Sequence, residues 1–253
     1  MRFDILTLFP EYFGGVFGSS ILKRAQANGT IEIGVHDIRS YTTDRHHVCD
    51  DAPYGGGAGM VMKAEPLALA VEDVLNFMVG HGEPPCPVIL LTPQGRRFDQ
   101  EIAQELSGHA RLCFVCGHYE GIDERFTEAV VTDEISIGDY VTTGGEPAAA
   151  VIVDAVARLA PGVLGNDDSA RFDSFGDGLL EAPQYTRPAV WRERGTPEIL
   201  LGGNHGAVER WRLKESLRRT ALRRPDLVEK ARASASWTQL KESLWRELQA
   251  EMS

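Results

Sequence analysis

Short apolar runs alternate with amphipathic stretches over the first 160 residues of the chain. Runs rich in Val, Ile, Leu and Phe predict β-strands at residues 3–9, 31–38, 88–92, 111–116 and 134–137. Helical spacing predicts helices at residues 62–78, 100–107, 122–130 and 146–159. The runs PVILLT and RLCFVCG are continuously apolar, which is typical of parallel strands buried on both faces. Strands that alternate with helices in this way predict an α/β fold with a parallel sheet.

The pattern changes after residue 160. The stretch PGVLGNDDSARFDSFGDG has little periodicity and predicts a flexible linker. Beyond it, Asn204 is a suitable N-cap for a long helix. Its apolar row is Leu213, Leu217 and Ala221, and a second row is Arg210, Lys214 and Arg218. With a last helix at 238–249, we expect an α/β domain at 1–162, a linker at 163–177 and a small, mainly helical domain at 178–253.

Composition and charge narrow the class of protein. The 253 residues are 43% apolar and 25% charged, as in ordinary globular proteins. The longest nearly apolar run, residues 147–157, is too short to cross a membrane, and the N-terminus lacks a signal-peptide pattern. We expect the four cysteines to be reduced thiols and the protein to be cytoplasmic.

The net charge of −11 is unevenly distributed. Residues 1–176 carry 12 basic and 26 acidic side chains, whereas residues 177–253 carry 14 and 11. A nucleic-acid-binding surface is usually basic, so only the C-terminal third could supply one.

Several familiar catalytic and metal motifs are missing. Cys113 and Cys116 have the spacing of a metal pair, but in a strand they point to opposite faces, and no second pair completes four ligands. We therefore expect no metal there. The sequence holds no nucleophile elbow and no P-loop. His46 and His47 could contact RNA or simply be solvated.

Glycine-rich segments are the strongest candidates for ligand binding. The segment PYGGGAGM at 53–60 is either an anion-binding nest or a tight structural loop. Three further glycine-bearing turns follow predicted strands, at 92–95 (TPQG), 116–121 (CGHYEG) and 137–146 (IGDYVTTGGE). Because parallel sheets bind ligands at the carboxyl ends of their strands, the three turns together predict a pocket for a flat ligand such as adenosine. Each of them alone would be no more than a turn.

Carboxylates in the predicted linker are candidates for a general base. These residues are Asp167, Asp168, Asp173 and Asp177. A linker carboxylate is more often just solvated. Arg158, at the end of a predicted helix, could balance the helix dipole or orient a substrate.

Taken in order, these motifs resemble the bacterial tRNA (guanine-N1) methyltransferases, TrmD, of the knotted SPOUT class. The resemblance runs from MRFDILTLFP through PYGGGAGM, LTPQGRRF, CGHYEGIDER and SIGDYVTTGGE to DSF, GLLEAPQYTRP and LLGGNHGAVERWRLKESLRRT. It implies methyl transfer from S-adenosyl-L-methionine to N1 of guanosine at tRNA position 37, next to the anticodon. It also implies a deep trefoil knot in the α/β domain, and basic C-terminal helices that hold tRNA.

The resemblance implies roles for individual residues. Its cofactor-binding loops correspond here to Pro93, Gly95, Gly117, Tyr119, Glu120, Ile137, Gly138, Asp139, Tyr140, Val141, Thr142, Gly144 and Gly145. The family's catalytic base, the aspartate of DSF, corresponds to Asp173, and its active-site arginine corresponds to Arg158. Family members are homodimers in which the partner's linker supplies the base, and Mg²⁺ is a candidate cofactor by the same resemblance. This chain has His118 where the family usually has Arg.

Two other functions fit the residues. The chain could be an RNA-binding module whose glycine loops are purely structural. It could also be a related knotted methyltransferase with a different nucleotide target.

Overall fold

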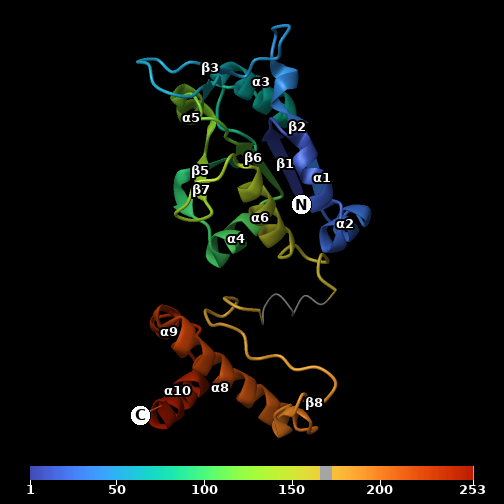
Figure 1. The fold of residues 1–253 in the computed structure, drawn as a ribbon, viewed down its shortest axis with the longest axis vertical. Helices are drawn as coiled ribbons and strands as arrows, with labels where there is room; N and C mark the ends of the chain where they lie inside the picture. Colours follow the sequence, from blue (N-terminus) through green and yellow to red (C-terminus); the bar gives the residue numbers. More distant parts are fainter. Residues whose placement is uncertain (166–172, 253) are drawn as a thin grey trace. The chain divides into compact units, whose positions relative to one another are not determined.

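The computed structural model describes residues 1–165 and 173–252, so the candidate carboxylates Asp167 and Asp168 lie outside the described residues. The chain divides into two compact units, Met1–Asn166 and Asp167–Ser253 (Figure 1). None of the helices in the described ranges is both long and apolar enough to cross a membrane.

A five-stranded parallel sheet forms the centre of the first unit. In chain order the strands are β1 (Arg2–Thr7), β2 (Glu32–Asp37), β5 (Val88–Arg97), β6 (Arg111–Cys116) and β7 (Asp133–Ser136). Their order in the sheet is β2-β1-β6-β5-β7, and every neighbouring pair is parallel. The prediction of an α/β fold with a parallel sheet is therefore confirmed.

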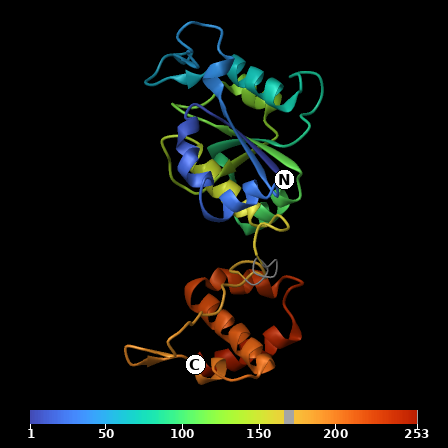
Figure 2. The ribbon, with the colours of Figure 1, turned by 90° about the vertical axis from the view of Figure 1, so that its right-hand side faces the viewer.

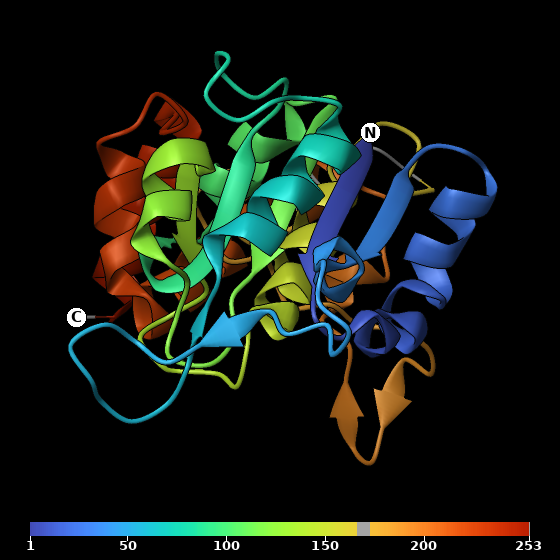
Figure 3. The ribbon, with the colours of Figure 1, turned by 90° about the horizontal axis from the view of Figure 1, so that it is seen from above.

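Helices cover both faces of the sheet, because successive side chains of a buried strand point to opposite sides. One apolar cluster joins the strands to α1 (Phe13–Phe17), α2 (Ser20–Ala27), α4 (Gln100–Ser107) and α6 (Glu146–Ala157). A second cluster on the other face joins them to α3 (Ala64–Leu75) and α5 (Glu124–Val130). Figure 3 shows α3 and α5 on one side of the strands and α6 on the other. The unit is thus a three-layer α/β/α structure.

Cys113 and Cys116 point to opposite faces of their strand, as predicted from the sequence. Cys116 belongs to the first apolar cluster and Cys113 to the second, so the two side chains lie on opposite faces of β6. Burial raises the pKa of both thiols, which keeps them neutral.

Shorter elements complete the first unit. They are the 3-10 helices η1 (Pro10–Tyr12) and η2 (Ile38–Tyr41) and a two-stranded antiparallel sheet of β3 (Asp50–Asp51) and β4 (Val61–Met62). This small sheet closes the glycine-rich loop at 53–60. Helices α1 and α2 were not predicted from the sequence, since they interrupt a stretch that contains several glycines.

The second unit is mainly helical. It contains the hairpin β8 (Val190–Trp191)–β9 (Arg194–Gly195), η3 (Glu198–Leu200), and helices α8 (His205–Arg223), α9 (Pro225–Arg232) and α10 (Gln239–Met252). As predicted, Asn204 caps α8, and its side chain accepts a hydrogen bond from the Ala207 amide at 3.1 Å. The core consists of Leu179, Leu217, Ala231, Leu244 and Leu248.

The basic row predicted on α8 is already paired with acidic residues of α10. Arg210 lies 2.5 Å from Glu247, and Lys214 and Arg218 lie 2.5 and 2.7 Å from Glu251. The predicted basic face of α8 is present, but carboxylates of α10 balance these three side chains, and the implied contact of this helix with tRNA stays a prediction. The balancing carboxylates lie more than 30 residues further along the chain, so helical periodicity within α8 alone could not find them.

A buried carboxylate connects three strands of the first unit. Asp4 on β1 is completely buried and contacts Arg2 (2.9 Å), His36 on β2 (2.8 Å) and Arg111 on β6 (2.8 Å). Burial alone would raise the pKa of Asp4, but hydrogen bonds from His36, Arg2 and Arg111 outweigh it and hold this pKa below its ordinary value.

Replacing this carboxylate should destabilise the fold. We expect Asp4→Asn to lower the free energy of unfolding at pH 7 by about 3 kcal/mol, because it leaves Arg111 without its counter-charge and removes one of the two carboxylates that Arg2 contacts. A lowered folded-state pKa contributes stability above the ordinary aspartate pKa and loses it as the pH falls, so the difference from wild type should shrink below about pH 4. Urea unfolding across pH measures both effects.

The matched control is Glu32→Gln, since Glu32 contacts the same Arg2 but is 68% exposed. Glu32→Gln should lower the free energy of unfolding by less than about 1 kcal/mol. A pH-independent difference between wild type and Asp4→Asn would contradict the role of the Asp4 charge.

Candidate functional site

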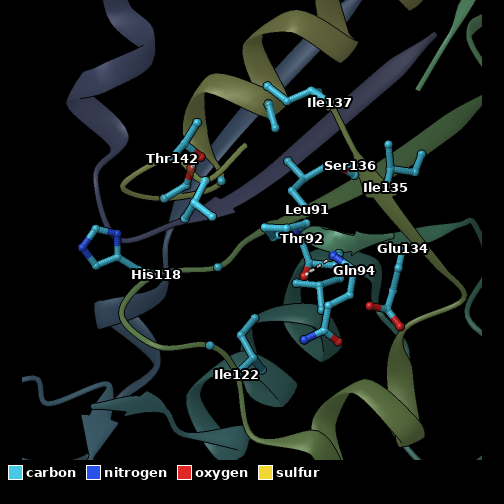
Figure 4. Close-up of a pocket in the computed structure, with 18 of the residues that line it drawn as sticks. Leu91, Thr92, Gln94, His118, Ile122, Glu134, Ile135, Ser136, Ile137 and Thr142 are labelled. Carbon is cyan, nitrogen blue, oxygen red and sulfur yellow. Dashed lines mark hydrogen bonds between the residues drawn. The ribbon is translucent and has the colours of Figure 1, made fainter. Parts of the chain in front are cut away.

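A pocket of about 400 Å³ opens in the first unit where three loops meet. They are residues 92–95 within β5, residues 117–122 after β6 and residues 137–145 after β7. Figure 4 shows Thr92 and Gln94 near its centre, with Ile122 on one side, Ser136 and Ile137 on another, and His118 and Thr142 opposite Glu134. The pocket lies at the carboxyl ends of parallel strands, as expected for this class of fold.

The structure brings nearly all the predicted cofactor residues together. Lining the pocket are Pro93, Gly117, Tyr119, Glu120, Ile137, Gly138, Tyr140, Val141, Thr142, Gly144 and Gly145. The exceptions are Gly95 and Asp139, which do not line it.

The sequence predicted that the segment at 92–95 is a turn after a strand, and the structure shows that this is wrong. The segment loops out within β5, because Leu91 and Arg96 both pair with Ile135 of β7. Gly95 then lies directly on the main chain of β7, where a Cβ would overlap backbone atoms of Glu134 and Ile135. Gly95 therefore shapes the pocket through a backbone contact instead of touching its interior.

A second close approach joins the other two loops. The Gly145 amide donates a hydrogen bond to the Gly117 carbonyl at 2.9 Å. A Cβ on Gly145 would lie 2.7 Å from Cα of Cys116. Only glycine allows these two loops to approach so closely.

The loop after β7 is held by hydrogen bonds of its own. Ser136 and Tyr140 donate from their hydroxyls to the carbonyls of Gly138 and Ile137, each at 3.1 Å. Thr142 donates to the Gly144 carbonyl at 2.8 Å. These contacts hold the loop in the conformation that lines the pocket.

Acidic side chains line the pocket. They are Glu120, Glu124 and Glu134, and no Lys or Arg is among the described residues of the lining. Sequence motifs indicated only Glu120, because Glu134 belongs to β7 and Glu124 begins α5. Thr92, Gln94 and His118 line the pocket from within the predicted turns, although they were not named as cofactor residues, and Ile122 and Ser136 line it from outside those turns. This charge favours a cationic ligand.

Two polar side chains lie behind the loop at 142–145. The buried carboxylate of Glu146 accepts a hydrogen bond from the Thr7 hydroxyl at 2.7 Å. The His118 ring lies 5.0 Å from the ring of Phe9 and 4.8 Å from that of Tyr119, and its buried Nδ1 has no hydrogen-bond partner among the residues that the structure describes. His118 thus contributes its apolar ring faces to the local packing.

The glycine-rich loop at 53–60 is joined to this pocket by main-chain hydrogen bonds. The Glu120 amide donates to the Met60 carbonyl at 3.0 Å, and the Met62 amide donates to the Gly121 carbonyl at 2.9 Å. Gly59 lies against the Glu120 side chain. At the other end of the loop, Tyr54 is fully exposed.

The two predicted catalytic residues belong to different units. Arg158 is the C-cap residue of α6 in the first unit. Asp173 belongs to the second unit, where its carbonyl accepts a hydrogen bond from the Gly176 amide at 3.1 Å. The residues after it form a turn attached to α8, since Ser216 donates to the Leu180 carbonyl at 2.6 Å. The catalytic assignment of both residues stays a prediction.

No three His, Cys, Asp or Glu side chains gather closely enough to hold a metal ion within the described parts of the chain.

Comparison with known proteins identifies the family. The family described as tRNA (Guanine-1)-methyltransferase TrmD matches residues 1–230. The chain belongs to this family. The match extends across the three pocket loops and both predicted catalytic residues of this TrmD-family chain.

Curated relatives support the assignment. A tRNA (guanine-N(1)-)-methyltransferase of Chloroflexus aggregans is 60% identical over 238 residues, which is 94% of this chain and 91% of the relative. Proteins of the same name from Dehalococcoides mccartyi and Geotalea uraniireducens are 58% and 56% identical, covering 91% and 97% of this chain and 91% and 98% of the relatives.

The close backbone approach at Gly95 gives a testable prediction. We expect Gly95→Ala to lower the free energy of unfolding by at least about 2 kcal/mol, because the added methyl must displace main chain. The matched control is Gly15→Ala in α1, where a Cβ meets open space, and its stability should stay within about 1 kcal/mol of wild type. Thermal unfolding measures both, and equal effects at the two sites would contradict the packing argument.

Proposed function

We propose that the protein transfers a methyl group from S-adenosyl-L-methionine to N1 of guanosine at tRNA position 37, next to the anticodon. The observation that carries this proposal is a pocket built from three loops that the TrmD family match covers. The relatives' name, tRNA (guanine-N(1)-)-methyltransferase, gives the same reaction class. Because the substrate is tRNA, we assign the activity to the cytoplasm.

The pocket suits S-adenosyl-L-methionine in charge and in shape. The ligand's sulfonium is cationic, and the carboxylates of Glu120, Glu124 and Glu134 provide complementary charge. The main chain of the loops at 117–122 and 137–145 would bind the adenosine part, since glycines there leave amides and carbonyls accessible. When bound, this ligand supplies an electrophilic methyl group on a positively charged sulfur.

The chemistry requires a base. Neutral guanine carries a proton on N1, so its lone pair is not free to attack a methyl group. In the proposed reaction the Asp173 carboxylate removes that proton, the N1–methyl bond forms and the sulfur–methyl bond breaks, leaving a neutral thioether. Arg158 would stabilise the negative charge that develops on O6 of the guanine. The family resemblance supports both roles.

The same resemblance supports a knotted fold and a homodimer. After β7, at one edge of the sheet, the chain returns to its middle, where α6 contacts β1 and β6. On the way it packs against Cys116 and Gly117, which is consistent with a trefoil knot. We propose that two chains assemble so that the linker of one provides Asp173 to the pocket of the other. Mg²⁺ remains a candidate cofactor, and no step here depends on it.

Ligand binding tests the proposal against a purely RNA-binding module. S-adenosyl-L-methionine at 100 times its Kd should stabilise the protein by about 2.7 kcal/mol, measured as a rise in Tm. Glu134→Gln should weaken binding by up to about fivefold, because it removes one pocket carboxylate. Glu128→Gln, on α5 but outside the pocket lining, is the control and should bind like wild type. The absence of any thermal shift would favour the binding module.

Methylation of tRNA tests the base. We expect Asp173→Asn to lower kcat by about 10²–10⁴-fold, as removal of a general base does, while Tm and S-adenosyl-L-methionine binding stay unchanged. Asp226→Asn, an exposed aspartate of α9, is the matched control and should keep full activity. Mass spectrometry of digested tRNA identifies the product.

Two results would contradict parts of this proposal. Near-native kcat in Asp173→Asn would remove Asp173 from the base role. A methyl group on another nucleotide would indicate a related knotted methyltransferase instead.

A further inference from the structure

The hairpin β8–β9 is the most exposed ordered element of the second unit. Every residue from 185 to 195 is exposed. Trp191 is 55% exposed and Val190 is 61% exposed. Figure 2 shows the hairpin (orange) projecting away from the helices of its own unit. Tryptophan is enriched at interaction surfaces, because its ring can bury a large apolar area while its N–H finds a hydrogen-bond partner.

The hairpin carries positive charge that the rest of the unit does not balance. Arg187, Arg192 and Arg194 form no ion pair with any described residue, whereas the arginines of the α8 row are paired with α10. The only acidic residue between 185 and 195 is Glu193. Unlike the predicted basic row, the hairpin therefore offers cations that are available to an anionic partner.

The aromatic ring and the cations are held together. Trp191 pairs with Arg194 across the two strands, which puts both side chains on one face. The Arg192 guanidinium lies 4.9 Å from the centre of the Trp191 ring, in a cation–π contact. The site thus combines a flat stacking surface with guanidinium donors.

The turn of the hairpin has a strained backbone, which indicates that surrounding contacts hold it in one conformation. Arg192 and Glu193 have φ angles of 47° and 66°, so both occupy the left-handed region. Two-residue hairpin turns of this kind normally use Asn and Gly, and side chains here cost of the order of 1 kcal/mol each. The Thr196 amide donates to the Ala189 carbonyl at 2.7 Å and closes the base of the hairpin.

We propose that the β8–β9 hairpin is a tRNA-contacting element in which an unpaired base stacks on Trp191 while Arg192 and Arg194 bind neighbouring phosphates. The inference rests on the proposed function for the identity of the RNA. Aromatic rings combined with arginines form the usual binding surface for unpaired nucleotides, because every base has a stacking face and every nucleotide carries a phosphate.

The test compares binding of an unmodified tRNA transcript at several salt concentrations. Trp191→Ala should weaken binding about tenfold with little change in salt dependence, because stacking is not ionic. Trp191→Phe keeps an aromatic ring and should therefore lose much less tRNA affinity than Trp191→Ala. Arg192→Ala/Arg194→Ala should reduce the slope of log K against log salt by about 1.5, since two phosphate contacts are lost. In methylation assays these losses should raise KM for tRNA and leave kcat unchanged.

The matched control is Arg246→Ala. Arg246 is an exposed arginine of the same unit whose charge Glu242 balances at 3.0 Å, so the variant should bind tRNA like wild type. All variants should keep the wild-type Tm and the wild-type response to S-adenosyl-L-methionine, because the hairpin residues are exposed.

Wild-type affinity and salt slope in both Trp191→Ala and Arg192→Ala/Arg194→Ala would overturn the inference. Unchanged tRNA binding combined with an altered elution volume in gel filtration would overturn it as well, and would assign the hairpin to a protein contact. Failure of the proposed function is a separate result: wild-type protein that binds tRNA through the hairpin but does not methylate guanosine would refute the reaction and leave the hairpin inference standing.

Discussion

Direct contact between main-chain segments is the constraint on which the pocket depends. Gly95 rests on the backbone of β7, and Gly145 rests on Cys116 and donates a hydrogen bond to Gly117. Because no side chains separate these segments, amides and carbonyls become part of the pocket wall. Ligand recognition through such a wall requires few specific side chains.

Charge is distributed between the two units according to the partners that each is proposed to bind. The pocket of the first unit is acidic, which suits a cationic methyl donor, while the hairpin of the second unit is basic, which suits a polyanion. Charges with structural roles are paired, as Asp4 is with its three partners and Arg210 is with Glu247. The net charge of −11 conceals this division.

Local sequence patterns correctly predicted the helices and strands that are determined by neighbouring residues in the chain. The strand at 111–116 and the helix at 100–107 have the predicted bounds, because one is a continuous apolar run and the other begins at the N-cap Asp99. Features that depend on distant residues were missed. The looping-out of 92–95 follows from pairing with Ile135, and the neutralised row on α8 follows from carboxylates on α10.

The candidate site was likewise predicted only where local motifs mark it. Glycine motifs located the three loops. Glu134 and Ser136 line the pocket because β7 lies next to β5 in the sheet, and no local motif indicates that neighbour. The hairpin β8–β9 was also missed, since its turn uses Arg192 and Glu193 instead of the Asn-Gly pair that marks such turns in a sequence.

Main-chain hydrogen bonds between the glycine-rich loop and residues 120–121 have a thermodynamic consequence. The Met60 carbonyl and the Met62 amide are bonded to residues 120 and 121, so the loop cannot move away from Glu120 without breaking these bonds, which costs free energy. Because Glu120 lines the pocket, the position of the glycine-rich loop and the shape of this part of the pocket wall depend on each other.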